Sequence, residues 1–145
     1  NVAFGKSVGA LPDGRKAGAP VNNGVSPSNG SERHGPTAVI NSEAKLPSIW
    51  FQKGSIFNMR LSADTLTNEE GRKRALALVK THFKNNQYHI QFNVLDDETL
   101  VEAQEKPEEY RDLMVRIAGY SAFFTPLNRE LQNDVIERMK FDMKK

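Results

Sequence analysis

The sequence predicts an α/β fold, because strand-like and helix-like patterns alternate along its second half. Apolar residues recur at every second position in two short segments, 55–61 and 88–94, which is typical of half-buried strands. Between and after these segments, apolar residues recur every three to four positions, which is typical of helices that bury one face. Alternation of strands and helices favours right-handed crossover connections and parallel strand pairing.

The N-terminal segment has a different composition. Residues 1–36 contain seven of the ten glycines and four of the seven prolines. Glycine permits tight turns and proline fixes φ, so we expect a long ordered loop here, with a disordered linker as the alternative. We divide the chain into a Gly/Pro-rich segment, residues 1–48, and a second domain, residues 49–145.

A capping box predicts where the first long helix begins. Thr67 and Glu70 have the Thr-x-x-Glu spacing in which each side chain accepts a hydrogen bond from the other residue's backbone N–H. The helix is expected to continue to about Lys84. Its apolar face is expected to carry Leu76, Val79 and Phe83.

The remaining elements continue the alternation. Asp96 or Asp97 can cap a short helix over residues 100–104. A third strand is expected over residues 113–117. Asn128 can cap a last helix. The apolar stripe of that helix consists of Leu131, Val135, Ile136 and Met139.

Composition places the chain among soluble globular proteins. Its 145 residues suffice for one domain with a hydrophobic core. A net charge of +2 gives no basis for a nucleic-acid-binding surface. No apolar run approaches the length of a membrane span, so we expect a cytoplasmic protein without a membrane partner. The chain has no cysteine and its three histidines do not cluster, so no metal site is expected.

The most informative segment is residues 114–124, where Gly119 separates a β-like apolar stretch from several aromatic residues. A glycine after a strand ordinarily serves a turn or a bulge. The segment also resembles the glycyl radical motif of the pyruvate formate-lyase and diol dehydratase families. Further segments resemble the same family in order and spacing: 9–18 with its Pro-Asp-Gly-Arg sequence, 24–30, 35–39, 88–94 and 111–116.

The resemblance implies that Gly119 stores an unpaired electron on its Cα, as a post-translational cofactor with no small molecule bound. Delocalisation into the two flanking amides requires a nearly planar centre, and only glycine is permissive enough. An α/β binding module with a chance glycine is the alternative, which the match along the whole chain disfavours.

Several neighbours match the motif: Arg116, Ala118, Tyr120 and Ser121. Arg116 either contacts an activating enzyme or pairs with a carboxylate, and the sequence does not separate these roles. We expect Tyr120 to pack against its surroundings, with a radical relay as the alternative. Phe123 and Phe124 are expected in the core. Arg15, in the Pro-Asp-Gly-Arg segment, is expected on the substrate side of the active site.

The resemblance further implies that this chain is the C-terminal part of a ten-stranded β/α barrel, with Gly119 on a loop inserted into the barrel. The radical would pass to a cysteine outside this chain, and residues 1–48 would pack on the catalytic barrel. We also expect the barrel to cover Phe57, Met59 and Leu61. Expected partners are a radical S-adenosylmethionine activating enzyme with an iron–sulfur cluster, a second copy of the full enzyme in a homodimer, and small accessory subunits.

The reaction depends on the branch of the family. Residues 115–124 resemble the dehydratase, decarboxylase and hydrocarbon–succinate branches, whereas 55–61, 125–128 and 137–141 depart from the dehydratase pattern. We therefore favour radical addition of a hydrocarbon to fumarate, as in benzylsuccinate and alkylsuccinate synthases. The alternatives are a glycyl radical dehydratase or decarboxylase of the glycerol, choline or arylacetate type, and a stand-alone protein that replaces an oxygen-damaged radical domain.

Overall fold

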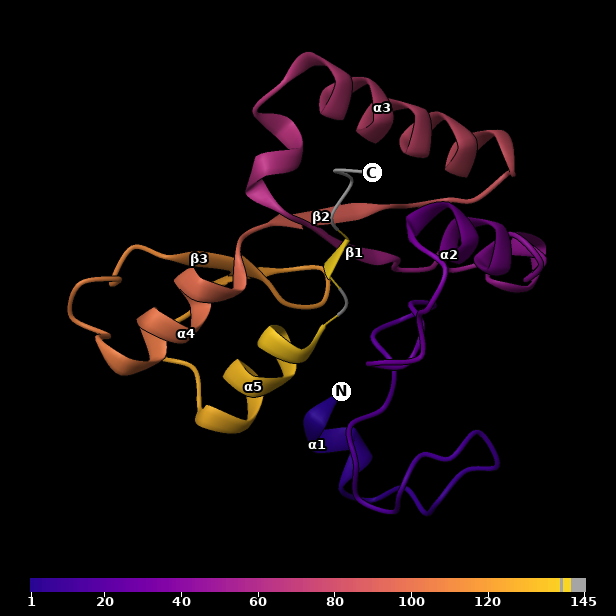
Figure 1. The fold of residues 1–145 in the computed structure, drawn as a ribbon. Coiled ribbons are helices and arrows are strands. Elements are labelled where there is room, and N and C mark those ends of the chain that lie inside the picture. The colour runs from indigo at the N-terminus through magenta and orange to yellow at the C-terminus, as the bar shows by residue number, and fades with distance from the viewer. Residues whose placement is uncertain (139, 142–145) are drawn as a thin grey trace.

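The computed structural model describes residues 1–138 in full. For residues 140 and 141 it describes the backbone alone. Figure 1 shows α3 lying along one side of the parallel strands, while α4 and α5 lie beside the β3–β4 hairpin. In chain order the elements are α1 (Val2–Gly5), α2 (Pro36–Glu43), the 3-10 helix η1 (Ser48–Trp50), β1 (Asn58–Leu61), the 3-10 helix η2 (Ala63–Leu66), α3 (Glu69–Lys84), β2 (Gln91–Val94), α4 (Asp97–Glu105), β3 (Met114–Arg116), β4 (Ser121–Phe123), α5 (Arg129–Glu137) and β5 (Lys140–Phe141).

The strands of the described residues form two separate sheets. Strand β1 pairs in parallel with β2 on one side and with β5 on the other, which confirms the expected parallel pairing for these strands. Strands β3 and β4 instead form an antiparallel hairpin, so the prediction of parallel pairing is wrong for the third strand. The chain reverses direction around Gly119, and so short a connection cannot make the crossover that parallel strands need.

The first hydrophobic cluster lies between the parallel sheet, α2 and α3. Phe57 is fully buried, and Met59 and Leu61 are almost so. The expectation that a barrel outside this chain covers these three side chains is therefore wrong, because α2 and α3 already cover them. The buried members of this cluster are Val39, Ile40, Phe57, Met59, Leu61 and Leu78.

Helix α3 begins one residue later than the capping box predicts. The N-cap is Asn68, whose side-chain oxygen accepts a 2.7 Å hydrogen bond from the backbone N–H of Gly71. Thr67 instead donates its hydroxyl hydrogen to the backbone carbonyl of Asp64 at 2.7 Å. Asn and Thr are both good N-caps, and the preceding 3-10 helix η2 leaves Asn68 in the extended conformation that a cap requires.

Helix α3 also buries a different face from the one predicted. Its buried residues are Gly71, Leu78 and His82, whereas Leu76 and Phe83 are about half exposed. The close approach at the start of the helix explains this rotation. A Cβ on Gly71 would lie 1.8 Å from the carbonyl oxygen of Thr65, so only glycine lets the helix pack so tightly on η2.

Two buried ionisable side chains lie within the first cluster. Nδ1 of His82 lies 3.3 Å from Oε2 of Glu43, and both side chains are almost completely buried. The imidazole of His82 stacks on Phe57 with ring centroids 5.5 Å apart. Burial raises the pKa of Glu43 to about 7 and lowers the pKa of His82, because both charged forms lose their hydration.

We expect the Glu43→Gln substitution to stabilise the protein increasingly as the pH rises. The folded state keeps a proton on Glu43 that the unfolded chain releases above pH 4.5, so the wild-type protein loses stability between pH 4.5 and about 7. The difference in unfolding free energy between variant and wild type should grow by about 3 kcal/mol across this window. Urea unfolding at several pH values measures it.

Comparing the pH dependence of stability in Glu43→Gln and in wild type separates the contribution of Glu43 from that of His82. A lowered pKa makes His82 destabilising as the pH falls below 6.5, and this opposite trend is present in both proteins. Glu105→Gln on the exposed surface of α4 is the matched control. A difference between Glu43→Gln and wild type that stays constant from pH 4.5 to 8 would contradict the buried neutral carboxyl.

The second hydrophobic cluster joins α4, the β3–β4 hairpin and α5. Phe124 is fully buried there, as expected, whereas Phe123 is 46% exposed, so its placement in the core is wrong within this chain. The two side chains alternate across the strand, and only one of the two faces meets the helices. The buried members of this cluster are Leu100, Ala103, Val115, Ile117, Phe124 and Val135.

The helices of this second cluster begin where the sequence predicts. The Asn128 side chain accepts a 2.9 Å hydrogen bond from the backbone N–H of Leu131, which confirms the cap of α5. Asp96 is the N-cap residue of α4, but its carboxylate accepts from Ser62 and Ala63 rather than from the helix. The stripe of α5 packs in the cluster as predicted, except that Met139 lies outside the described residues.

Candidate functional site

Gly119 lies at the tip of the β3–β4 hairpin. Arg116 and Ser121 are register partners, and the backbone N–H of Ile117 donates a 2.9 Å hydrogen bond to the carbonyl of Tyr120. Ala118 and Gly119 therefore form the turn between the two strands, and Gly119 is exposed in this chain. The backbone that would carry the radical thus projects from two packed strands.

The backbone conformation at Gly119 favours glycine. Its φ is +84°, in the left-handed region that side chains rarely adopt. A Cβ built at this position would lie 3.1 Å from Cδ1 of Ile56, which is closer than an ordinary van der Waals contact. A hairpin turn makes the same demand for glycine, so this geometry is compatible with a radical centre without by itself requiring one.

Arg116 is held inside the domain. Its Nε donates to the side-chain oxygen of Gln91 at 2.9 Å, and its Nη1 donates to the hydroxyl of Ser121 at 3.2 Å. The described partners are therefore an amide and a hydroxyl, so the carboxylate alternative is not observed, while contact with an activating enzyme stays a prediction. Ser121, the other flanking residue of the motif, serves as an acceptor that ties β4 to β3.

The aromatic side chain beside the turn points outward. Tyr120 is 53% exposed, so the packing expected for it is absent within this chain. Met114 and Phe123, which are register partners, are 56% and 46% exposed. The hairpin therefore has one face buried against α4 and α5 and another face that carries large uncovered apolar side chains.

Three side chains to which the sequence assigned no role at the hairpin hold its first strand just before the turn. Asn93 on β2 accepts from the backbone N–H of Arg116 at 2.7 Å and donates to its carbonyl at 2.8 Å. Asn23 in the N-terminal segment donates to the carbonyl of Ile117 at 2.8 Å. Arg138 donates to the carbonyls of Arg116 and Ile117 at 3.1 and 2.8 Å. The two residues before the turn are thus fixed through their backbones.

These anchors carried almost no signal in the sequence. Asn93 alone could have been found, since it is a polar residue inside the alternating segment 88–94 and is nevertheless almost buried. Asn23 is 94 positions away from the carbonyl that it contacts. Nothing in the local pattern connects Arg138 with the hairpin.

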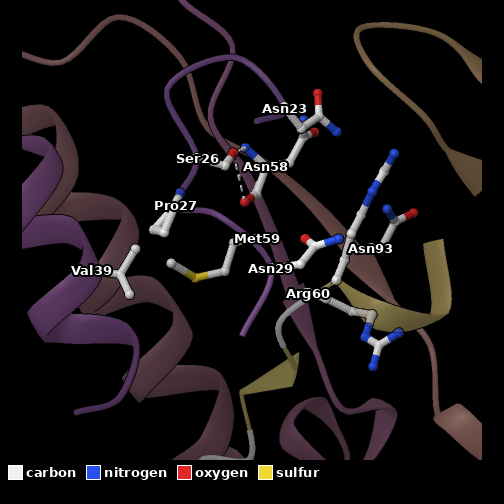
Figure 2. A pocket seen from close by; sticks show the side chains of 10 residues that line it. Asn23, Ser26, Pro27, Asn29, Val39, Asn58, Met59, Arg60 and Asn93 are labelled. Carbon is white, nitrogen blue, oxygen red and sulfur yellow. Dashed lines mark hydrogen bonds between the residues drawn. The ribbon is translucent and has the colours of Figure 1, made fainter. Parts of the chain in front are cut away.

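A small cavity of about 30 Å³ adjoins these anchors. Figure 2 shows Asn29, Asn93 and Arg60 gathered on one side of it, with Met59 and Val39 on the other. A cavity of this size accommodates water but no substrate. It lies among the residues that support the hairpin.

A larger hollow of about 600 Å³ lies between the N-terminal segment and α5. Arg15 lines one wall, and Asp134 and Arg138 line another. The guanidinium of Arg15 donates to the backbone carbonyls of Val8, Gly9 and Ala19. In this chain Arg15 therefore organises its own loop, and its role toward a substrate stays a prediction.

The described residues, 1–138 with 140 and 141, contain neither a candidate metal site nor a candidate membrane span. No group of three or more histidine, aspartate or glutamate side chains in this part of the chain could hold a metal ion. No helix within it is long and apolar enough to cross a membrane.

Comparison with known proteins places this geometry in a family. A family model described as glycine radical matches residues 21–125. The chain is 46% identical over 139 residues to the probable dehydratase YbiW of Escherichia coli strain K12, covering 95% of this chain and 17% of that protein. It is 43% identical over 138 residues to the trans-4-hydroxy-L-proline dehydratase of Clostridioides difficile, with the same two coverages.

Solved structures give the same result. The glycerol-bound form of the B12-independent glycerol dehydratase from Clostridium butyricum matches with a TM-score of 0.94 and 44% identity, covering 99% of this chain and 18% of that one. The chain thus spans about one sixth of the length of these relatives. Enzymes of this kind carry a glycyl radical that is generated post-translationally. With the model matching residues 21–125 and these identities over nearly its whole length, the chain belongs to the glycine radical family.

Proposed function

We propose that this chain is the glycyl radical domain of a dehydratase and that Gly119 is the radical residue. The observation that carries the proposal is the position of Gly119 at the exposed tip of an anchored hairpin, inside the segment matched by the family model. The identity to two proteins named as dehydratases and to a glycerol dehydratase structure supports the reaction class.

The hairpin places Gly119 where both an activating enzyme and a catalytic cysteine can approach it. The radical on Gly119 would supply hydrogen-atom abstraction through a cysteine outside this chain. Asn93 and Arg138 fix the backbone on one side of the turn, while the glycine itself stays uncovered. An exposed tip is accessible both to an activating enzyme and to a catalytic cysteine that approaches from another part of the enzyme.

The uncovered apolar side chains support a barrel outside this chain. Met114, Tyr120 and Phe123 are each about half exposed and lie on the same hairpin as Gly119. Burial of such side chains against another surface is favourable, by about 25 cal/mol per Å² of apolar area. We propose that the catalytic barrel covers them, that residues 1–48 pack on it, and that the full enzyme is a homodimer activated by a radical S-adenosylmethionine enzyme.

Dehydration replaces fumarate addition as our preferred reaction. The relatives reported above include two dehydratases and a glycerol dehydratase structure, and none of these three is named for addition to fumarate. The preference drawn from residues 55–61, 125–128 and 137–141 therefore lacks support. Departures in those short segments say little about the reaction when the identity over the whole chain is 43% or more in these comparisons.

Product analysis of the complete enzyme tests this function. After anaerobic activation, we expect glycerol or another vicinal diol, or a hydroxylated amino acid, to lose one molecule of water per turnover. Diols would yield the aldehyde, which mass spectrometry detects. The control reaction contains toluene and fumarate. Formation of a succinate adduct without any dehydration product would contradict the proposal.

A further inference from the structure

The hairpin that carries Gly119 contacts the rest of the domain through polar anchors as well as through its apolar face. Arg138, directly after α5, provides two of these anchors from a single nitrogen, Nη1. The residue is 9% exposed, which is unusual for an arginine. A buried guanidinium that binds two consecutive backbone carbonyls determines the direction of the chain as it enters the turn.

The guanidinium is itself fixed by a carboxylate on α5. Nη2 of Arg138 lies 2.9 Å from Oδ2 of Asp134, four residues earlier, and both side chains are nearly buried. One nitrogen therefore contacts α5 and the other contacts the hairpin. The planar fork of arginine makes this bridge rigid, whereas a lysine would present a single point charge.

The helix that carries this pair is braced against the parallel sheet. Arg60 on β1 donates to the carbonyls of Val135 and Ile136 at 3.2 and 3.0 Å, which are among the last carbonyls of α5. Arg60 also forms an ion pair with Asp97 at the start of α4. The bonds thus run without interruption from β1 through α5 to the two residues before the turn.

We propose that Arg138, oriented by Asp134, is the positioning residue that holds the Gly119 hairpin in its catalytic place and limits how readily it opens. The proposal rests on the proposed function, since it assigns a role toward the radical at Gly119. Arg138 touches neither the radical carbon nor a substrate and acts through the backbone of Arg116 and Ile117. Without the hydrogen bonds of Arg138 to the hairpin, the radical should still form on Gly119, but turnover per radical should fall.

The first test measures opening in the complete enzyme before activation. We expect Arg138→Gln to accelerate hydrogen exchange of the hydrogen-bonded amides of Arg116 and Ile117 by about 10- to 100-fold, as loss of hydrogen bonds to a charged group implies. Arg138→Lys should lie in between. Arg129→Gln, at the exposed start of the same helix, is the matched control and should leave the exchange unchanged.

The second test compares radical content with turnover after activation. Electron paramagnetic resonance gives the number of radicals per chain. We expect Arg138→Gln to reach at least the wild-type radical content, while turnover per radical falls tenfold or more. Asp134→Asn should act in the same direction, and Arg129→Gln should not. A merely structural loss would reduce radicals and turnover together and leave turnover per radical unchanged, and that result would overturn the proposal.

A further variant covers failure to fold. Arg138→Gln leaves the Asp134 carboxylate buried without its partner, which is strongly destabilising. The double variant Arg138→Gln/Asp134→Asn removes the unpaired charge as well as the bridge. Unchanged hydrogen exchange at Arg116 and Ile117 in this double variant would also overturn the proposal. Absence of any radical in the activated wild-type enzyme would contradict the proposed function instead, and the exchange experiment would still test the bridge.

Discussion

Gly119→Ala should abolish the doublet signal of a glycyl radical in electron paramagnetic resonance of the anaerobically activated enzyme. A methyl group leaves one abstractable hydrogen in place of two and hinders the planarity on which delocalisation depends. The structure adds that the new Cβ would sit 3.1 Å from Ile56 Cδ1 and would force a left-handed φ on alanine. This strain costs about 1–2 kcal/mol.

The backbone strain itself has a matched control. Gly54 has a φ of +89°, and a Cβ there would meet no atom within 4 Å. Gly54→Ala therefore imposes a comparable strain far along the sequence from the motif. We expect this variant to keep the full signal. An undiminished signal in Gly119→Ala, or its equal loss in both variants, would refute the assignment of the radical to Gly119.

Exposure of the activated enzyme to air should cut the chain at Gly119. A carbon-centred radical captures dioxygen, and the resulting peroxyl group fragments the backbone at the same residue. The expected products are a long piece ending near Ala118 and a short piece beginning near Tyr120, which intact mass spectrometry resolves. Gly119 is exposed at the turn in this chain, so oxygen meets no steric barrier once the hairpin is uncovered.

The cleavage has two controls. The unactivated enzyme and the activated Gly119→Ala variant should both remain intact in air, because neither holds a radical at this position. The fraction of chains that are cut should not exceed the fraction that carried a radical before exposure to air. Cleavage at another residue, with the radical confirmed beforehand, would refute the assignment independently of the first experiment.

Together the two results would connect the exposed turn with the chemistry. The loss of signal identifies the residue by substitution, and the cleavage identifies it by its own reactivity. Arg138 binds the carbonyls of Arg116 and Ile117 rather than the turn itself. This position explains how the hairpin can be held firmly while Gly119 stays accessible.

The sequence by itself determined the features that depend on neighbouring residues. The alternation at 55–61 and 88–94 predicted two strands, and these two strands pair in parallel with each other in one sheet. Asn128 predicted the start of α5, because a cap needs only a side-chain oxygen and an N–H three residues later. Gly119 was recognisable because a whole segment of local sequence surrounds it.

Only the tertiary structure decided which faces meet and which distant side chains support the glycine. The apolar periodicity of α3 is compatible with burial of more than one face of the helix. The close approach of Gly71 to Thr65 favours a buried face that leaves Leu76 and Phe83 about half exposed. Asn23 and Arg138 reach the carbonyl of Ile117 from 94 positions before and 21 positions after it. A hydrogen bond to a backbone carbonyl leaves no periodic trace in the sequence, since every residue has such a carbonyl and only the fold brings a particular donor to it.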